Sequence, residues 1–79
     1  MKIYDKDLIR EWASLGITDH DIVELLALRS SCAYECDNVS RACSYEGLPS
    51  HGVEYEVRCA NIRRRYTEDE SEILSKYAL

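Results

Sequence analysis

Residues 17–46 read ITDHDIVELLALRSSCAYECDNVSRACSYE, and this stretch decides the fold. Its start is typical of a helix N-terminus, because Thr18 can act as the cap and Asp21, three positions later, completes a capping box. Ile17 and Ile22 stand at the two positions of a hydrophobic staple. Apolar side chains then keep one helical spacing along the whole stretch, at Ile22, Leu25, Cys32, Cys36, Val39 and Cys43. The stretch predicts one long helix over about 18–46.

An alternative divides this stretch at Arg29-Ser30-Ser31, where Ser31 could cap a new helix. Uncapped helices longer than about 25 residues are uncommon in globular proteins. A turn would normally reset the spacing of the apolar residues, however, and the spacing continues across the two serines. We therefore favour a single helix, which could kink at the serines.

A first, shorter helix is predicted from Asp5 to about Leu15. Asp5 can cap its start, and Gly16 suits the position directly after its end. Tyr4 and Ile9 stand at the positions of a second hydrophobic staple. The apolar stripe of this helix consists of Leu8, Ile9, Trp12 and Leu15.

After the loop GLPSHG at 47–52, the sequence pattern fits more than one type of secondary structure. Residues 53–59 alternate like a strand, but the chain offers no comparable partner strand. A helix over 53–65 has acids early and arginines late, as the helix dipole favours, so we favour the helix. Thr67-Glu68-Asp69-Glu70 reads as a second capping box and predicts a separate last helix with an apolar face of Ile73, Leu74, Tyr77 and Ala78. The sequence thus predicts an all-α fold, a small bundle of four to five helices.

The length of 79 residues leaves room for one domain, residues 1–79. A chain this short buries roughly 60% of its unfolded surface, which leaves little core to enclose a substrate and argues against an enzyme. No apolar run approaches the length of a membrane span, and the first residues lack the apolar segment of a signal peptide. We therefore expect a cytoplasmic protein, in the producing or the host cell, that has no membrane partner.

The charge balance is acidic, with 15 Asp and Glu against 10 Lys and Arg and a net charge of −5. Such a chain repels nucleic acid at long range and attracts basic protein surfaces. We therefore expect a protein partner and no direct binding of nucleic acid.

Four cysteines, Cys32, Cys36, Cys43 and Cys59, continue the apolar spacing and are expected to be reduced core thiols. A zinc site formed with His51, or a disulfide from Cys59, is an alternative, but the spacing lacks the short C-x2-C knuckle of a zinc site. Neither His20 nor His51 is fixed beside a cysteine, as thiol catalysis would require. No phosphate-binding loop or catalytic motif is present, so we expect no catalytic residues, no metal ligands and no cofactor.

A DNA-binding helix-turn-helix motif is an alternative interpretation of function, because residues 15–26 are similar in pattern to the first helix of that motif. The motif requires a short turn, which would fall at Arg29-Ser30-Ser31, and then a recognition helix with basic residues. That second segment carries Glu35, Asp37 and Glu46 against Arg41, a balance that phosphates would repel.

The candidate partner site lies on the predicted helix 53–66, which has two apolar stripes. Val53, Val57 and Ala60 fall on one side, and the tyrosines fall nearly opposite. A small domain has few elements to cover both sides, so we expect the tyrosine-bearing side to bind a protein partner or to form a homodimer. Aromatic and Arg anchors are typical of binding hot spots, and the residues expected to bind are Tyr55, Arg58, Ile62, Arg63, Arg65 and Tyr66. The alternative is that this side is core and that the arginines cap their helix.

These observations favour a small acidic, non-enzymatic protein–protein interaction module. An inhibitor or adaptor that docks on a basic surface of nucleic-acid-handling machinery fits the charge. Phage-encoded inhibitors such as anti-CRISPR proteins share this size and charge, an analogy that no motif supports. The alternatives are the helix-turn-helix regulator of DNA and, third, a zinc- or redox-sensing protein.

Overall fold

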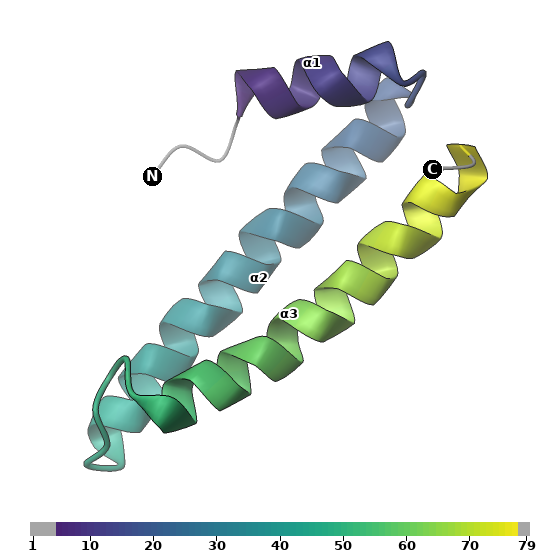
Figure 1. The fold of residues 1–79 in the computed structure, drawn as a ribbon. Helices are drawn as coiled ribbons and strands as arrows, with labels where there is room; N and C mark the ends of the chain where they lie inside the picture. The colour runs from purple at the N-terminus through teal and green to yellow at the C-terminus, as the bar shows by residue number, and fades with distance from the viewer. Residues whose placement is uncertain (1–4, 78–79) are drawn as a thin grey trace.

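The computed structural model describes residues 5–77, which form three α-helices and one short 3-10 helix (Figure 1). In chain order they are α1 (Lys6–Ser14), α2 (Asp19–Tyr45), α3 (Val53–Leu74) and η1 (Ser75–Tyr77). The helices α2 and α3 run antiparallel as a long hairpin, and α1 lies across the hairpin's open end. The all-α prediction is confirmed for the described residues, but the bundle has fewer helices than the predicted four to five.

The prediction of one long central helix is confirmed, because α2 runs without interruption through Arg29-Ser30-Ser31. Its N-cap is Thr18, whose hydroxyl accepts a hydrogen bond from the Asp21 amide at 3.3 Å. At its C-terminus Gly47 has a φ of 78°, and the Leu48 amide donates to the Cys43 carbonyl at 2.8 Å. Glycine tolerates this left-handed conformation, which lets the loop amides satisfy the last carbonyls of the helix.

The predicted start and end of the first helix are also confirmed. The Asp5 carboxylate caps α1 by accepting bonds from the amides of Asp7 and Leu8, at 3.0 and 3.2 Å. Gly16, with a φ of 85°, ends it as expected. The proposed staple partner Tyr4 lies outside the described residues, as does Ala78 of the last predicted face.

The prediction of a separate last helix beginning at Thr67 is wrong, since α3 continues through this position to Leu74. Residues 53–59 are helical, as favoured, and Glu54 pairs with Arg58 at 3.0 Å. A capping box stabilises a helix start by only about 1 kcal/mol. A break at Thr67 would separate Tyr66 from Ile73, two side chains on the side of α3 that packs against α2, so the uninterrupted helix is the more stable arrangement.

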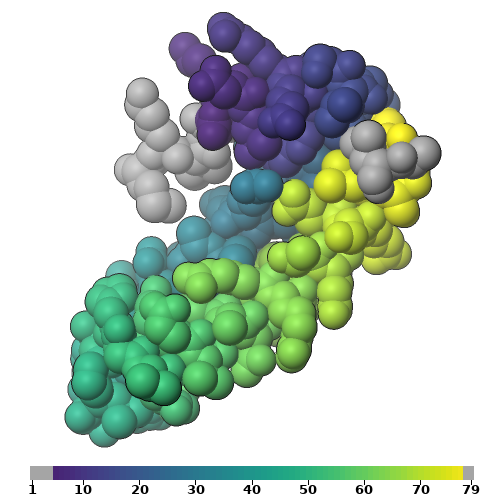
Figure 2. Space-filling view, in the orientation of Figure 1, coloured from purple at the N-terminus to yellow at the C-terminus, as the bar shows by residue number. Residues whose placement is uncertain are grey.

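The core is divided into two clusters along the hairpin. The first joins all three helices at the open end and contains Trp12, Ile17, Ile22, Leu25 and Leu26, with Ile73, Leu74 and Tyr77 packed against them. The second joins only α2 and α3, near the loop, and contains Cys36, Cys43, Tyr55 and Cys59. The molecule is elongated as a result, with extents of 47 × 24 × 15 Å, and α1 covers one end only (Figure 2).

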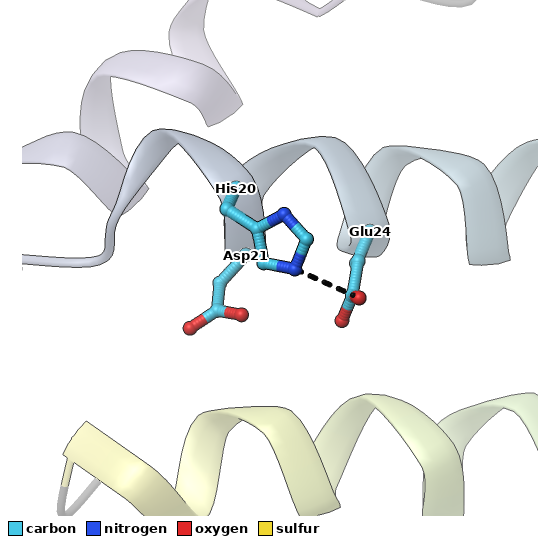
Figure 3. Close-up of side chains that lie close together, drawn as sticks. All are labelled: His20, Asp21 and Glu24. Atoms are coloured by element: carbon cyan, nitrogen blue, oxygen red, sulfur yellow. Dashed lines mark ion pairs between the residues drawn. The ribbon is translucent and has the colours of Figure 1, made fainter.

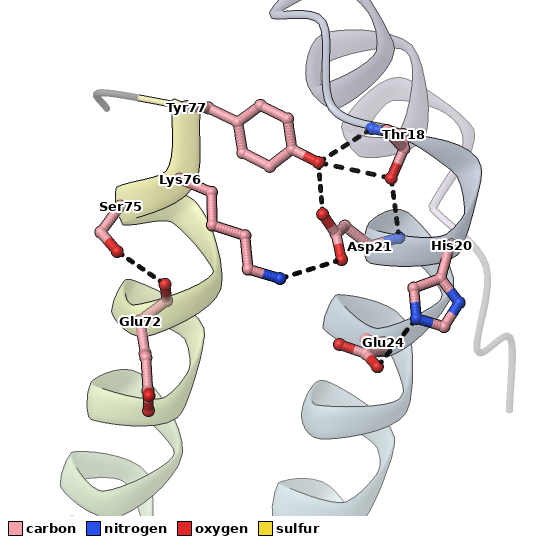
Figure 4. Close-up of polar contacts among 8 residues, drawn as sticks. All are labelled: Thr18, His20, Asp21, Glu24, Glu72, Ser75, Lys76 and Tyr77. Carbon is pink, nitrogen blue, oxygen red and sulfur yellow. Dashed lines mark hydrogen bonds and ion pairs between the residues drawn. The ribbon is translucent and has the colours of Figure 1, made fainter.

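A polar cluster joins the first turn of α2 to the end of the chain (Figure 4). The Tyr77 hydroxyl donates a short hydrogen bond to the Asp21 carboxylate and accepts one from the Thr18 amide at 3.2 Å. The Lys76 ammonium lies 3.6 Å from the same carboxylate. The Tyr77 phenol therefore binds the Thr18 amide, which the acid of a capping box would otherwise bind.

No described helix is long and apolar enough to span a membrane.

Replacing Thr18 by Ala should destabilise the fold by about 1 kcal/mol, because the α2 cap loses its side-chain acceptor. Thr67→Ala is the matched control, since Thr67 lies inside α3 and alanine is the better helix former by about 0.5 kcal/mol. Urea unfolding measures both effects. An equal loss of stability at Thr67 would mean that a helix begins there after all.

Replacing Tyr77 by Phe should lower the urea midpoint and flatten its dependence on acid pH. The hydrogen bond from Tyr77 is the main cause of the lowered pKa of Asp21, with Lys76 adding to it. A carboxyl whose pKa is lowered by folding contributes stability above its unfolded value of about 3.9, and this stability is lost as the pH falls through the folded value. Identical pH profiles for the two proteins would contradict this role of Tyr77.

Candidate protein-binding site

The structure buries part of the site expected from the sequence. Tyr55 retains only 9% exposure within the second core cluster, where its ring meets His51 edge to face at a centroid distance of 4.6 Å. Ile62 packs against the same cluster, and Tyr66 is half-buried. The expectation that this stripe faces a partner is therefore corrected for Tyr55 and Ile62, which face α2. The expected alternative, that this side is core, describes their placement.

The arginines flanking that stripe are engaged by acids of the same chain. Arg58 donates to Glu54 at 3.0 Å and to Glu46 at 2.8 Å. Arg65 donates to Glu35 at 2.9 Å, while Arg63 lies 4.0 Å from Glu56. The hydrogen bond to Glu46, more than that to Glu54, raises the pKa of Arg58, and the bond to Glu35 raises that of Arg65.

Exposed ion pairs of this kind contribute little to stability, but they occupy the positive charges. The residues expected as basic anchors, Arg58, Arg63 and Arg65, therefore form no free basic patch. The valine stripe, on the opposite side of α3, is the exposed one: Val53 is 82% exposed and Val57 is 53% exposed.

The structure shows instead an acidic groove between α2 and α3, a feature that the sequence did not reveal. Its volume is about 390 Å³, and it is lined by Glu24, Ala27, Leu28, Asp69, Glu72 and Ile73. Three of the lining residues are acidic, the other three are apolar, and none is basic. The two helices contribute equally, with residues 24–28 from α2 and residues 69–73 from α3.

This arrangement suits a lysine or arginine side chain from a partner. The long aliphatic stems of these residues pack on apolar surface while their charged ends stay among polar groups. A guanidinium can also bind a carboxylate through two parallel hydrogen bonds. Glu24, Asp69 and Glu72 do not form a group of converging ligand atoms, so a side chain with an extended cation fits the groove better than a compact metal ion.

One group of potential metal ligands does converge within residues 5–77, namely His20, Asp21 and Glu24 on the first turns of α2 (Figure 3). His20 and Glu24 are an exposed i,i+4 pair at 3.2 Å. Asp21 is buried and already holds Tyr77 and Lys76. Binding a cation there would require Asp21 to give up the contacts that close the hairpin, so the group is better explained as part of that closure.

Two of the four cysteines, Cys32 and Cys36, line a groove on the other side of the hairpin. A thiol groove of about 540 Å³ is lined by Leu28, Arg29, Cys32, Ala33, Cys36, Asp37, Arg63, Tyr66, Thr67 and Glu70. At about 100° per residue, Arg63 and Thr67 lie on the side of α3 opposite Asp69 and Glu72, so the two grooves open on opposite faces. The prediction of core cysteines is confirmed for the buried residues Cys36, Cys43 and Cys59.

The Cys36 thiol and the Arg29 guanidinium in the thiol groove have little capacity to react or to bind an anion. Burial, with the neighbouring Cys59 thiol as the next cause, raises the pKa of Cys36 to about 12. A thiol with such a pKa is almost entirely protonated at neutral pH, and the thiolate is the reactive form. Arg29, which could attract an anion, pairs with Glu70 at 3.1 Å. The groove therefore offers no thiolate at Cys36 and no unpaired Arg29.

Alkylation with iodoacetamide should modify Cys32 first, because it is the half-buried cysteine that borders the thiol groove. Cys36, Cys43 and Cys59 should react only when the protein unfolds, since burial excludes the reagent and, at Cys36, the raised pKa suppresses the thiolate. Peptide mapping by mass spectrometry measures the order. Equal rates at Cys32 and Cys59 in the folded protein would show that the core is more open than the structure indicates.

Comparison of the chain with protein-family models, with curated proteins and with solved structures returned no match.

Proposed function

We propose that this protein is a small acidic, non-enzymatic interaction module that docks on a basic protein surface through the acidic groove. The observation that carries the proposal is that the lining of the groove contains three acids and no basic residue. Arg29, Arg58 and Arg65 are held by acids of their own chain, whereas Asp69 and Glu72 have no ion-pair partner among the described residues. The charge left over at the groove is therefore negative.

The shape of the groove supports a protein partner. Leu28 and Ile73 give the groove apolar area that a partner side chain can cover, and the acidic lining residues provide the charge. Complementary charge raises association rates and selects partners, while the apolar contact contributes binding energy. A helix or loop that projects one or two arginines has the required chemistry.

An inhibitor or adaptor is the specific form that we propose. A protein that covers a basic, nucleic-acid-binding surface needs acids directed outward and no catalytic group. Phage anti-CRISPR proteins share this size and charge, and the comparison rests on those two properties alone. The regulator of DNA finds less support, because α2 is continuous at 29–31, where that motif places its turn, and because Arg58 and Arg65 are paired.

An arginine-rich helical peptide should bind the wild-type protein, and the double variant Asp69→Lys, Glu72→Lys should bind it about tenfold more weakly or worse. Fluorescence anisotropy of the labelled peptide measures the affinity. Raising the salt concentration should weaken binding, because the contact is electrostatic. The wild-type protein should also pass through a heparin column at physiological salt.

The matched control is Asp7→Lys, Glu11→Lys, which changes the net charge by the same amount on α1, away from the groove. This control should retain most of the affinity. Equal losses in the two double variants would reduce the effect to net charge and contradict a site in the groove. Retention on heparin would favour the regulator of DNA instead.

A further inference from the structure

The outward face of α2, opposite the side that packs on α3, carries large apolar side chains that no described residue covers. It consists of Val23, Ser30, Tyr34, Asn38, Arg41 and Tyr45, with Ala27 at the edge that this face shares with the acidic groove. Val23 is 64% exposed, Tyr34 is 66% exposed and Tyr45 is 92% exposed. Arg41 is the one formally charged residue on this face, although the protein as a whole is highly charged.

The spacing on this face is symmetric about Tyr34. Val23 precedes Tyr34 by eleven residues, and Tyr45 follows it by eleven, so both lie about 16.5 Å away along the helix. Eleven residues make slightly more than three full turns, so the three side chains project in nearly the same direction. Ala27 and Arg41 are likewise equidistant from Tyr34, as are Ser30 and Asn38. A face with this symmetry can match a reversed copy of itself.

The exposed area of the molecule is large for its mass. The chain of 9.1 kDa exposes 5719 Å², whereas a compact monomer of this mass exposes about 4,900 Å². Its radius of gyration is 15.0 Å, against about 12 Å for a compact chain of this length. The excess of several hundred Å² is similar to the roughly 800 Å² that each partner buries in a standard interface.

We propose that the outward face of α2 binds the same face of a second copy of the chain, antiparallel, with the two-fold axis at Tyr34. The two Tyr34 rings then meet on the axis, and Val23 of each copy lies under Tyr45 of the other. The aliphatic stem of Arg41 covers Ala27, and its charged end lies one helical turn from Glu24 of the other copy. Contacts repeated in this way are those of an isologous interface.

Two acidic chains repel each other at long range, so this interface depends on apolar contact. Added salt screens the repulsion and should strengthen dimerisation. The acidic groove should respond in the opposite sense, since its binding depends on attraction between charges. The dimer does not depend on the proposed docking function, and the two can fail separately.

Sedimentation velocity over a wide concentration range tests the proposal. The wild-type protein should form a dimer whose population rises with salt, and Tyr34→Lys should be monomeric. Val57→Lys, which adds the same charge at an exposed apolar position of α3, should dimerise like the wild type. Tyr45→Lys repeats the test at a position that is 92% exposed, so the substitution should leave the fold intact. Circular dichroism checks that it does.

Tyr34→Cys adds a geometric test, because a residue on the two-fold axis meets its own copy. Under mild oxidation it should form a covalent dimer, whereas Val57→Cys should not. A wild-type protein that remains monomeric at every concentration would overturn the proposal. Loss of the dimer in Val57→Lys, with Tyr34→Lys unaffected, would overturn it as well and move the interface to α3.

Discussion

The hydrogen bonds of the Tyr77 phenol to Thr18 and Asp21 close the open end of the hairpin, and the arrangement of the other elements depends on them. At the other end α2 and α3 are joined by a short covalent loop, but here the contacting residues are 59 and 56 positions apart in the chain. Together with the two core clusters, this closure fixes how far α3 lies along α2. That register decides which side chains meet across the hairpin and therefore where the grooves form.

The sequence predicts the parts of this fold whose causes are local. The caps Asp5 and Thr18 and the end of α1 at Gly16 each depend on a few adjacent residues, so a pattern in the chain suffices to find them. Thr67 carries an equally good cap signal, yet packing against α2 overrides it, because a cap contributes less to stability than an uninterrupted apolar face does. The role of Tyr77 leaves no local signature, since its partners lie at the far end of the sequence.

The candidate site shows the same contrast between features with local causes and features that depend on long-range contacts. Periodicity reveals two apolar stripes on α3 but does not say which one faces α2. The inward stripe is the one whose Tyr55 and Cys59 meet Cys36 and Cys43 of α2, a pairing that follows from the antiparallel register. The pairing of Arg65 with Glu35 depends on the same register, and it turns an expected basic anchor into an internal contact. Asp69 was visible in the sequence as part of a predicted helix start, and only the fold brings Asp69 and Glu72 beside Glu24.

A hairpin of two helices leaves more surface uncovered than a bundle, because each helix has one neighbour instead of two or three. The single added helix, α1, packs only at the open end, so along the rest of the hairpin α2 and α3 pack only against each other among the described residues. The surfaces that result differ in chemistry: the acidic groove lies on one face, and the outward edge of α2 is apolar and nearly uncharged. Because one surface gains from electrostatic attraction and the other from the removal of apolar area from water, they are suited to different partners. A hairpin with one added helix can in this way present two surfaces of different chemistry.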